Sequence, residues 1–218
     1  MLENASGFSE LRRLGARSVP VLSRGDEFVF AQNLGHVVKF LGLNERADPL
    51  LVPRELMRRL DSFLVAALRL VPQMPDAKLD VEVPNRPRSY RVLGHHIFRI
   101  AETFLEVAAG DELKYEKLTA SPPDTMRTTA DIIRYGTDVR RRLDAWWDAK
   151  SDREGRETVK TYYGPQSLHE YMERTTWHVG QHVRQWVMLL QMAGIAPDRP
   201  PPETDFNGLP MPSSVWDG

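Results

Sequence analysis

Two histidines one helical turn apart are the residues whose types and spacing most directly suggest chemistry. His178 and His182 lie in the segment SLHEYMERTTWHVGQHVRQWVMLLQMA, residues 167–193. On a helix, residues four positions apart share one face, so these two imidazoles can bind one metal ion together. A buried, hydrogen-bonded histidine pair is the alternative interpretation. A third histidine on a neighbouring helix would favour the metal site.

The same helix face carries further polar side chains. Tyr171 and Thr175 precede the histidines at helical spacing, and either orient a ligand or simply pack in the interior. Gln181 and Gln185 lie close by in the sequence and can accept hydrogen bonds from imidazole N–H groups. These four residues are therefore candidates for the surroundings of a metal site.

A third imidazole is available in the segment SYRVLGHHIFRIAETFLEVAAG, residues 89–110. His95 and His96 are adjacent, so on a helix they point about 100° apart and cannot both face the same neighbour. His96 shares its stripe with apolar residues such as Leu93 and Ile100, so we expect His96 inside and His95 at the rim, although either could be the ligand. Three histidines leave one coordination position open, whereas structural zinc sites usually have four protein ligands.

Composition excludes several classes of function. The chain has 218 residues, 41% of them apolar, a formal net charge of −1 and no cysteine. The charge argues against nucleic-acid binding, and the missing cysteines exclude thiolate ligands and dithiol redox chemistry. No apolar run is long enough to cross a membrane, and the first residues lack the apolar core of a signal peptide. We expect a cytoplasmic protein without membrane or nucleic-acid partners.

Helical periodicity dominates the chain after residue 52. Residues 53–70, 89–110, 124–150 and 167–193 each carry one apolar stripe. This pattern predicts a mainly α protein whose residues 53–195 form an antiparallel four-helix bundle. The tail, residues 196–218, is rich in proline but also contains large apolar side chains, so we expect it to pack on the bundle.

The first 43 residues have a different pattern. A helix is expected at residues 7–14, strands at 18–22 and 27–31, and a helix at 33–41. This order resembles the second half of a glutaredoxin, with Ser18-Val19-Pro20 at the position of the family's Thr-Val-Pro element. The resemblance implies a small α/β half-thioredoxin segment, a cis Val19–Pro20 bond, and a backbone contact to a thiol at Val19 and Pro20. Because the segment lacks Cys-x-x-Cys, packing or dimerisation is the alternative role.

Three sequence elements together resemble the DinB-like metal-binding four-helix bundles. They are G-H-H-I before residue 98, T-W-H-V-G-Q-H-V-R-Q after residue 175, and the ending G-L-P-M-P-S-S-V-W-D. The subfamily it is most similar to joins a truncated glutaredoxin-like segment to the bundle. The resemblance implies that His96, His178 and His182 hold zinc or nickel, and that the protein is a homodimer.

The resemblance also implies a reaction. Enzymatic members of that superfamily use a low-molecular-weight thiol such as glutathione, mycothiol or bacillithiol in S-transfer or isomerisation. A divalent metal would deprotonate the thiol, which suits a chain without cysteine and a small electrophilic substrate. Two alternatives stay open. One is a non-catalytic stress protein that binds a metal or small ligand; the other is a metal-hydroxide hydrolase, for which the last helix offers only Glu170 and Glu173 as bases.

Overall fold

The chain divides into two compact units. In the computed structural model, which describes residues 5–16, 19–45, 48–84 and 86–216, one unit comprises Met1–Pro49 with Tyr163–Pro165. The other comprises Leu50–Tyr162 with Gln166–Gly218. Each unit is described by itself.

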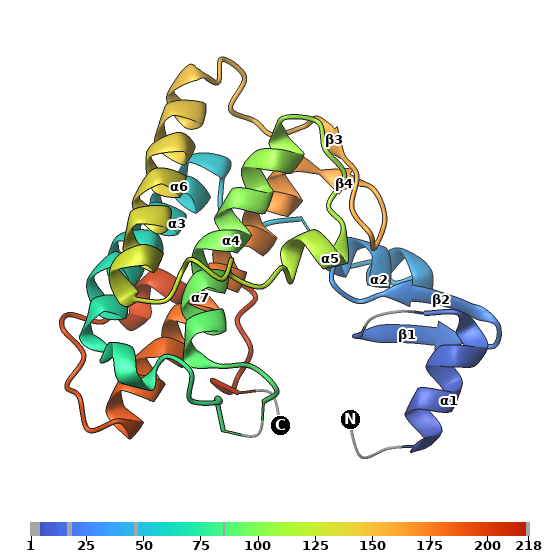
Figure 1. Ribbon diagram of the computed structural model, residues 1–218. Coiled ribbons are helices and arrows are strands. Elements are labelled where there is room, and N and C mark those ends of the chain that lie inside the picture. Colours follow the sequence, from blue (N-terminus) through green and yellow to red (C-terminus); the bar gives the residue numbers. More distant parts are fainter. Residues whose placement is uncertain (1–4, 17–18, 46–47, 85, 217–218) are drawn as a thin grey trace. The chain divides into compact units, whose positions relative to one another are not determined.

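Four long helices form most of the larger unit (Figure 1). They are α3 (Pro53–Leu70), α4 (Tyr90–Ala108), α6 (Thr129–Ala149) and α7 (Leu168–Met192). Helix α7 packs against both α3 and α4, and α6 packs against the same two helices from the other side of the unit. This arrangement places α4, which carries His95 and His96, between α6 and α7.

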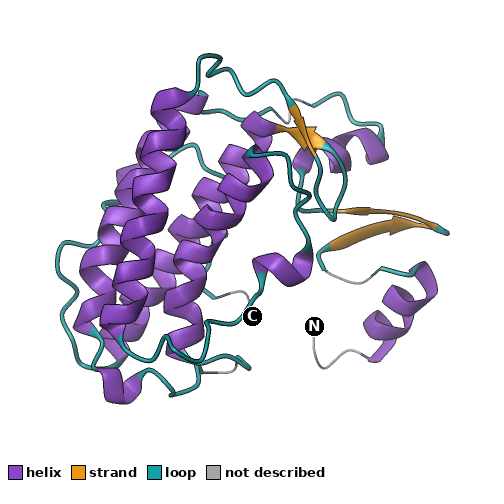
Figure 2. Cartoon of the chain, turned by 45° about the horizontal axis from the view of Figure 1, so that its top comes forward, coloured by secondary structure: helices purple, strands orange, loops and turns teal. Residues whose placement is uncertain are grey.

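Short elements connect these helices. Figure 2 shows the only regular strands of the larger unit's described residues, β3 (Thr158–Val159) and β4 (Gln166–Ser167), which pair antiparallel just before α7. The remaining elements are the 3-10 turns η1 (Val71–Gln73), η2 (Asp76–Lys78) and η3 (Glu203–Phe206) and the single-turn helix α5 (Tyr115–Leu118).

Capping residues determine where the long helices begin. Ser167 and Glu170 form a capping box, in which each side chain accepts a hydrogen bond from the other residue's backbone N–H. The predicted start of the third helix at residue 124 is wrong. Thr128 and Asp131 form a second capping box, so α6 begins at Thr129.

Two glycines allow the helices around α4 and α7 to approach closely. A Cβ atom at Gly136 on α6 would lie 2.6 Å from the ring of Phe98 on α4. A Cβ atom at Gly180 on α7 would lie 2.9 Å from the ring of Phe63 on α3. Since Gly180 lies between His178 and His182, the contact with α3 fixes the depth of the histidine-bearing turn.

The smaller unit contains α1 (Ala5–Leu14), the hairpin strands β1 (Val21–Arg24) and β2 (Glu27–Phe30), and α2 (Leu34–Leu41). The order of elements agrees with the expectation, but the first strand begins later than predicted. The Val19–Pro20 bond is cis, as expected, while Ser18 lies outside the described residues. None of the α2 residues is buried within the described structure.

Candidate metal centre

Three imidazoles meet between α4 and α7. His178 and His182 lie one turn apart on α7, and His96 faces them from α4. One nitrogen from each ring can be chosen so that all three lie within 4.8 Å of one another. The Nε2 atoms of His178 and His182 are 3.1 Å apart. The sequence-based choice of His96 rather than His95 as the third member thus agrees with the geometry.

The geometry of this group fits a divalent metal. Two metal–nitrogen bonds of about 2.0–2.1 Å at a tetrahedral angle place their nitrogens about 3.3 Å apart, close to the Nε2–Nε2 distance. In the described part of the chain, no carboxylate joins the group. A set of three imidazoles suits zinc, nickel, cobalt and copper, so the ligands do not select one metal.

Gln185 determines which nitrogen of His182 is available. Its Oε1 lies 2.7 Å from Nδ1 of His182, while its Nε2 donates to the carbonyl of Val215 at 3.1 Å. Because an amide oxygen only accepts hydrogen bonds, Nδ1 of His182 must carry the proton. The Nε2 lone pair of His182 therefore faces the other two histidines, as metal binding requires.

The tail segment Pro212–Trp216 lies against this part of α7. The amide of Gln181 donates to the carbonyls of Ser214 and Val215, at 3.2 and 2.7 Å. Arg184 donates to the carbonyl of Pro212 at 3.2 Å. Backbone carbonyls of the tail thus hold Gln185, and through it the ring of His182.

Burial keeps the three imidazoles neutral. It lowers the pKa of His182 to about 3, with Arg88 as the next cause and Gln185 opposing the shift. Burial is also the main reason that the pKa values of His96 and His178 lie well below their usual range, with smaller effects of His182, Arg88 and Arg174. Neutral imidazoles at physiological pH are the form that binds a metal without releasing protons.

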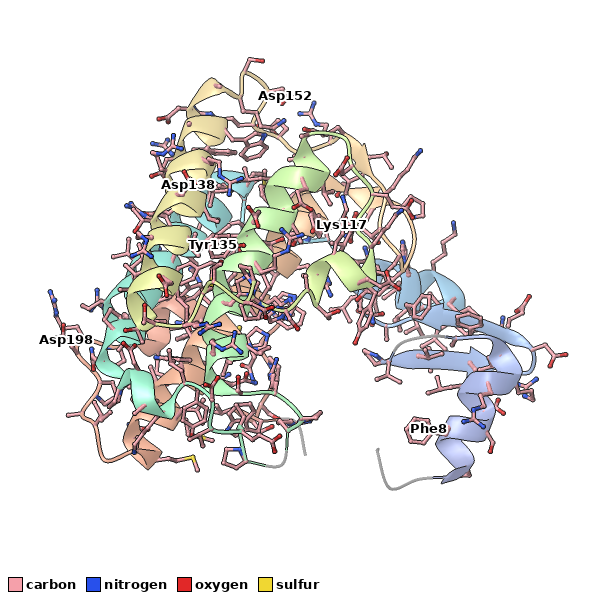
Figure 3. The ribbon with its side chains drawn as sticks, viewed as in Figure 1. Phe8, Lys117, Tyr135, Asp138, Asp152 and Asp198 are labelled. Atoms are coloured by element: carbon pink, nitrogen blue, oxygen red, sulfur yellow. The ribbon has the colours of Figure 1, made fainter. Side chains whose placement is uncertain are left out.

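The prediction that His95 lies at the rim is wrong. His95 is 4% exposed, and its ring stacks on Tyr135 of α6 with centroids 5.1 Å apart. Figure 3 shows Tyr135 projecting from α6 toward α4. The sequence suggested a solvent-facing stripe because Arg99 and Glu102 share it, but these two side chains form an ion pair at 2.6 Å against α6.

The remaining predicted residues have different surroundings. Thr175, one turn before His178, is 1% exposed, and its Oγ1 has no hydrogen-bond partner among the described residues. Tyr171 is buried and its ring stacks on Phe104 of α4 with centroids 5.7 Å apart. Thr175 is thus a polar group close to the histidines, whereas the ring of Tyr171 contributes to the core.

Val19 and Pro20 belong to the smaller unit. The carbonyl of Val19 accepts a hydrogen bond from Nε2 of Gln32 at 3.0 Å, and the carbonyl of Pro20 accepts one from the backbone N–H of Ala31 at 2.9 Å. Both carbonyls therefore accept hydrogen bonds within this unit.

Two arginines near the histidines were not singled out from the sequence. Arg174 is one turn before His178 on α7 and is 7% exposed. Its spacing of four residues from His178 is a signal that could have been used. Arg88 precedes α4 in an irregular segment, and its Nη2 lies 3.4 Å from Oε1 of Gln185. No helical periodicity marks Arg88, so only the folded chain reveals its position.

Comparison with known proteins supports the fold. No protein-family model matches the chain, and no curated protein matches it. Among solved structures, the chain is similar to a DinB-like protein from Bacillus cereus ATCC 10987, with a TM-score of 0.51 and 14% identity. The match covers 63% of this chain and 89% of that protein. At this identity the similarity shows a DinB-like helical fold and nothing about activity.

The helices were also compared with the length and hydrophobicity that a membrane span requires. Within the described residues, every helix is too short or too polar to pass through a bilayer.

Proposed function

We propose that this protein binds a divalent metal, zinc or nickel, through His96, His178 and His182, and uses it to activate a low-molecular-weight thiol. The observation that supports the proposal is the buried three-imidazole group, which no carboxylate joins among the described residues. Three protein ligands leave a coordination position for a small molecule. We propose that the larger unit is a four-helix bundle of the DinB type and that this bundle holds the site.

The reaction we propose is transfer of the thiol to a small electrophile, or isomerisation through a reversible thiol adduct. A metal in this site would lower the pKa of an entering thiol and so supply the nucleophile at neutral pH. In the transfer, the thiol proton passes to solvent, a carbon–sulfur bond forms, and the leaving group departs with the bonding electron pair. Because the chain has no cysteine, the sulfur must come from a cosubstrate such as glutathione.

The chain's own residues orient the site for this reaction. Gln185 holds His182 in the tautomer whose Nε2 faces the group. Thr175 offers a buried hydroxyl without a described hydrogen-bond partner, which a ligand of the site could use. For the smaller unit, taken by itself, we propose the role its glutaredoxin resemblance implies, a backbone contact to a thiol at Val19 and Pro20.

Hydrolysis by a metal-activated water is less well supported. Such a reaction needs a carboxylate base near the metal. The carboxylate of Glu170 already accepts hydrogen bonds from the backbone N–H and the hydroxyl of Ser167, at 2.7 and 2.8 Å. Glu173 accepts a backbone hydrogen bond from Leu50, and neither acid belongs to the histidine group.

Metal analysis of protein purified without a histidine tag is the first test. We expect about one equivalent of metal per chain, as for a single three-histidine site, and its loss in His178→Ala. His169→Ala is the matched control on the same helix, because His169 contacts the carbonyl of Leu51 instead. The metal-loaded protein is then assayed for glutathione consumption with 1-chloro-2,4-dinitrobenzene. Bound metal without thiol binding or turnover would indicate the non-catalytic alternative.

A further inference from the structure

Arg88 differs from several other partly buried arginines of the larger unit, although Arg184 also donates to neutral acceptors, Oε1 of Gln181 and the carbonyl of Pro212. Arg59 pairs with Glu55 at 2.7 Å, and Arg99 and Arg142 each pair with Glu102 at 2.6 Å. Arg140 likewise forms an ion pair with Asp61. Such pairing is expected, because a partly buried charge without a counter-charge costs free energy.

Arg88 forms no ion pair with any residue in the described ranges. Its only side-chain hydrogen bond there is the 3.4 Å contact with Oε1 of Gln185, which is a neutral acceptor. Burial, with a further contribution from Arg86, lowers the pKa of Arg88, the direction expected for a cation without a counter-charge. The guanidinium nevertheless stays charged at any physiological pH.

The position of this cation points to the histidine group. The same Oε1 atom of Gln185 contacts Arg88 and Nδ1 of His182, so one side chain separates the guanidinium from a metal ligand. Arg174, on the turn before His178, adds a second positive charge, and both arginines disfavour protonation of His96 and His178. A divalent metal would raise this positive charge further.

We infer that the molecule completing the metal site is an anion, with a carboxylate that binds Arg88 while its thiol faces the three histidines. The inference rests on the proposed function and narrows its substrate class to thiols that carry a carboxylate. A guanidinium binds a carboxylate through two parallel hydrogen bonds, which gives orientation as well as affinity. Arg88 suits this role better than Arg174, because the Arg88 residue is partly exposed whereas Arg174 is buried.

The test compares two thiols that differ in one group. The cobalt-loaded full chain is titrated with 3-mercaptopropionate and with its neutral amide, 3-mercaptopropanamide, and binding is followed by the visible spectrum of the metal. We expect the acid to bind at least about 10-fold more tightly than the amide, the range of one charge-assisted bond. The carboxylate also raises the pKa of the thiol, so at a given pH less of the acid than of the amide is present as thiolate. A preference for the acid would therefore not come from a larger thiolate fraction.

Variants of Arg88 complete the test. In Arg88→Met the acid should lose its advantage while the amide binds as before, and Arg88→Lys should restore part of the preference. Arg54→Met is the matched control, because Arg54 is exposed at the start of α3 and takes part in none of the site's contacts. Equal affinity of the two thiols for the unmodified protein would overturn this inference alone. No spectral change with either thiol would overturn both the inference and the proposed function.

Discussion

Two polar clusters lie on different faces of α4, and each contains one of two adjacent histidines, His95 and His96. His95 faces α6, where Glu102 accepts hydrogen bonds from Tyr135, Arg99 and Arg142, each at 2.6 Å. His96 faces α7, where it meets two more imidazoles and no carboxylate among the described residues. Acidic and basic charges alternate in the first cluster, whereas the second brings three imidazoles together with Arg88 and Arg174 beside them.

We interpret the first cluster as a structural network and the second as the proposed binding site. In the α4–α6 cluster the charged groups satisfy one another, although Nδ1 of His95 has no hydrogen-bond partner among the described residues. In the α4–α7 cluster, three imidazoles meet beside two arginines, an arrangement that we propose a metal and an anion complete together. Adjacent histidines on one helix thus have different roles, set by the helix each one faces.

The largest expected effect separates the two histidines directly. His182→Ala should reduce metal affinity by more than about 100-fold, beyond the 10–100-fold typical of residues outside the ligand set. His95→Ala should leave about one equivalent of metal bound, because its ring stacks on Tyr135. Metal content of both dialysed proteins checks this prediction. Metal loss in His95→Ala with metal retained in His182→Ala would contradict the prediction, because the metal would then depend on the cluster of His95.

The second effect concerns the other cluster. Glu102→Gln should lower the free energy of unfolding by about 2–3 kcal/mol, because Arg99 and Arg142 lose a shared carboxylate. This is less than for a fully buried pair, since the Arg142 side chain is 38% exposed. Urea unfolding measures the change, and metal content should stay unaltered. A stable Glu102→Gln protein that has lost its metal would contradict the assignment of this cluster as structural.

The third effect tests how the tail contributes to the metal site. Gln185→Leu should weaken metal binding about 10–100-fold, because His182 loses the acceptor that orients its ring. Gln181→Leu is the matched control, since Gln181 also donates to the tail but contacts no histidine among the described residues. Competition with a metal-binding dye measures both affinities. Equal weakening would mean that the tail acts on the fold rather than on His182.

The three-histidine group could be predicted from the sequence because helical spacing determines its geometry. His178 and His182 are four residues apart, and the apolar neighbours of His96 indicate which adjacent histidine faces α7. The depth of His95 could not be predicted in the same way. Its stripe contains Arg99 and Glu102, and only the position of α6 shows that these charges neutralise each other away from solvent.

Helical periodicity could not predict the contacts between segments that are distant in the sequence. Arg88 lies near His182 only because the irregular segment before α4 runs beside α7, and the tail contacts Gln185 across 30 residues. The start of α6 was missed for a local reason. Thr128 and Asp131 form a capping box, whereas the apolar stripe on which the predicted range rests does not mark the exact first residue of a helix.

The smallest effect is expected from Glu173 on α7. Glu173 is an acidic counterpart of Arg88. It is a half-buried acid without an ion pair among the described residues, and burial raises its pKa to about 7. Its ordinary pKa is 4.5, so between pH 4.5 and 7 the folded protein binds more protons than the unfolded chain. The stability that protonated Glu173 contributes is therefore complete below pH 4.5 and is lost as the pH rises through 7.

Substitution by glutamine should remove this pH dependence, because the amide resembles the protonated acid at every pH. We expect Glu173→Gln to raise Tm at pH 8 by about 2–4 °C, the shift that about 1 kcal/mol produces in a chain of this length, and to change Tm little at pH 4.5. Glu112→Gln, which removes an exposed acid, controls for the change in net charge. An equal shift at both pH values would show that Glu173 is ionised at both, so that burial does not neutralise a charge without an ion pair on this face of α7. The absence of a counter-charge at Arg88 would then be a weaker sign of a missing anion, so this measurement on Glu173 also tests the comparison between the two clusters.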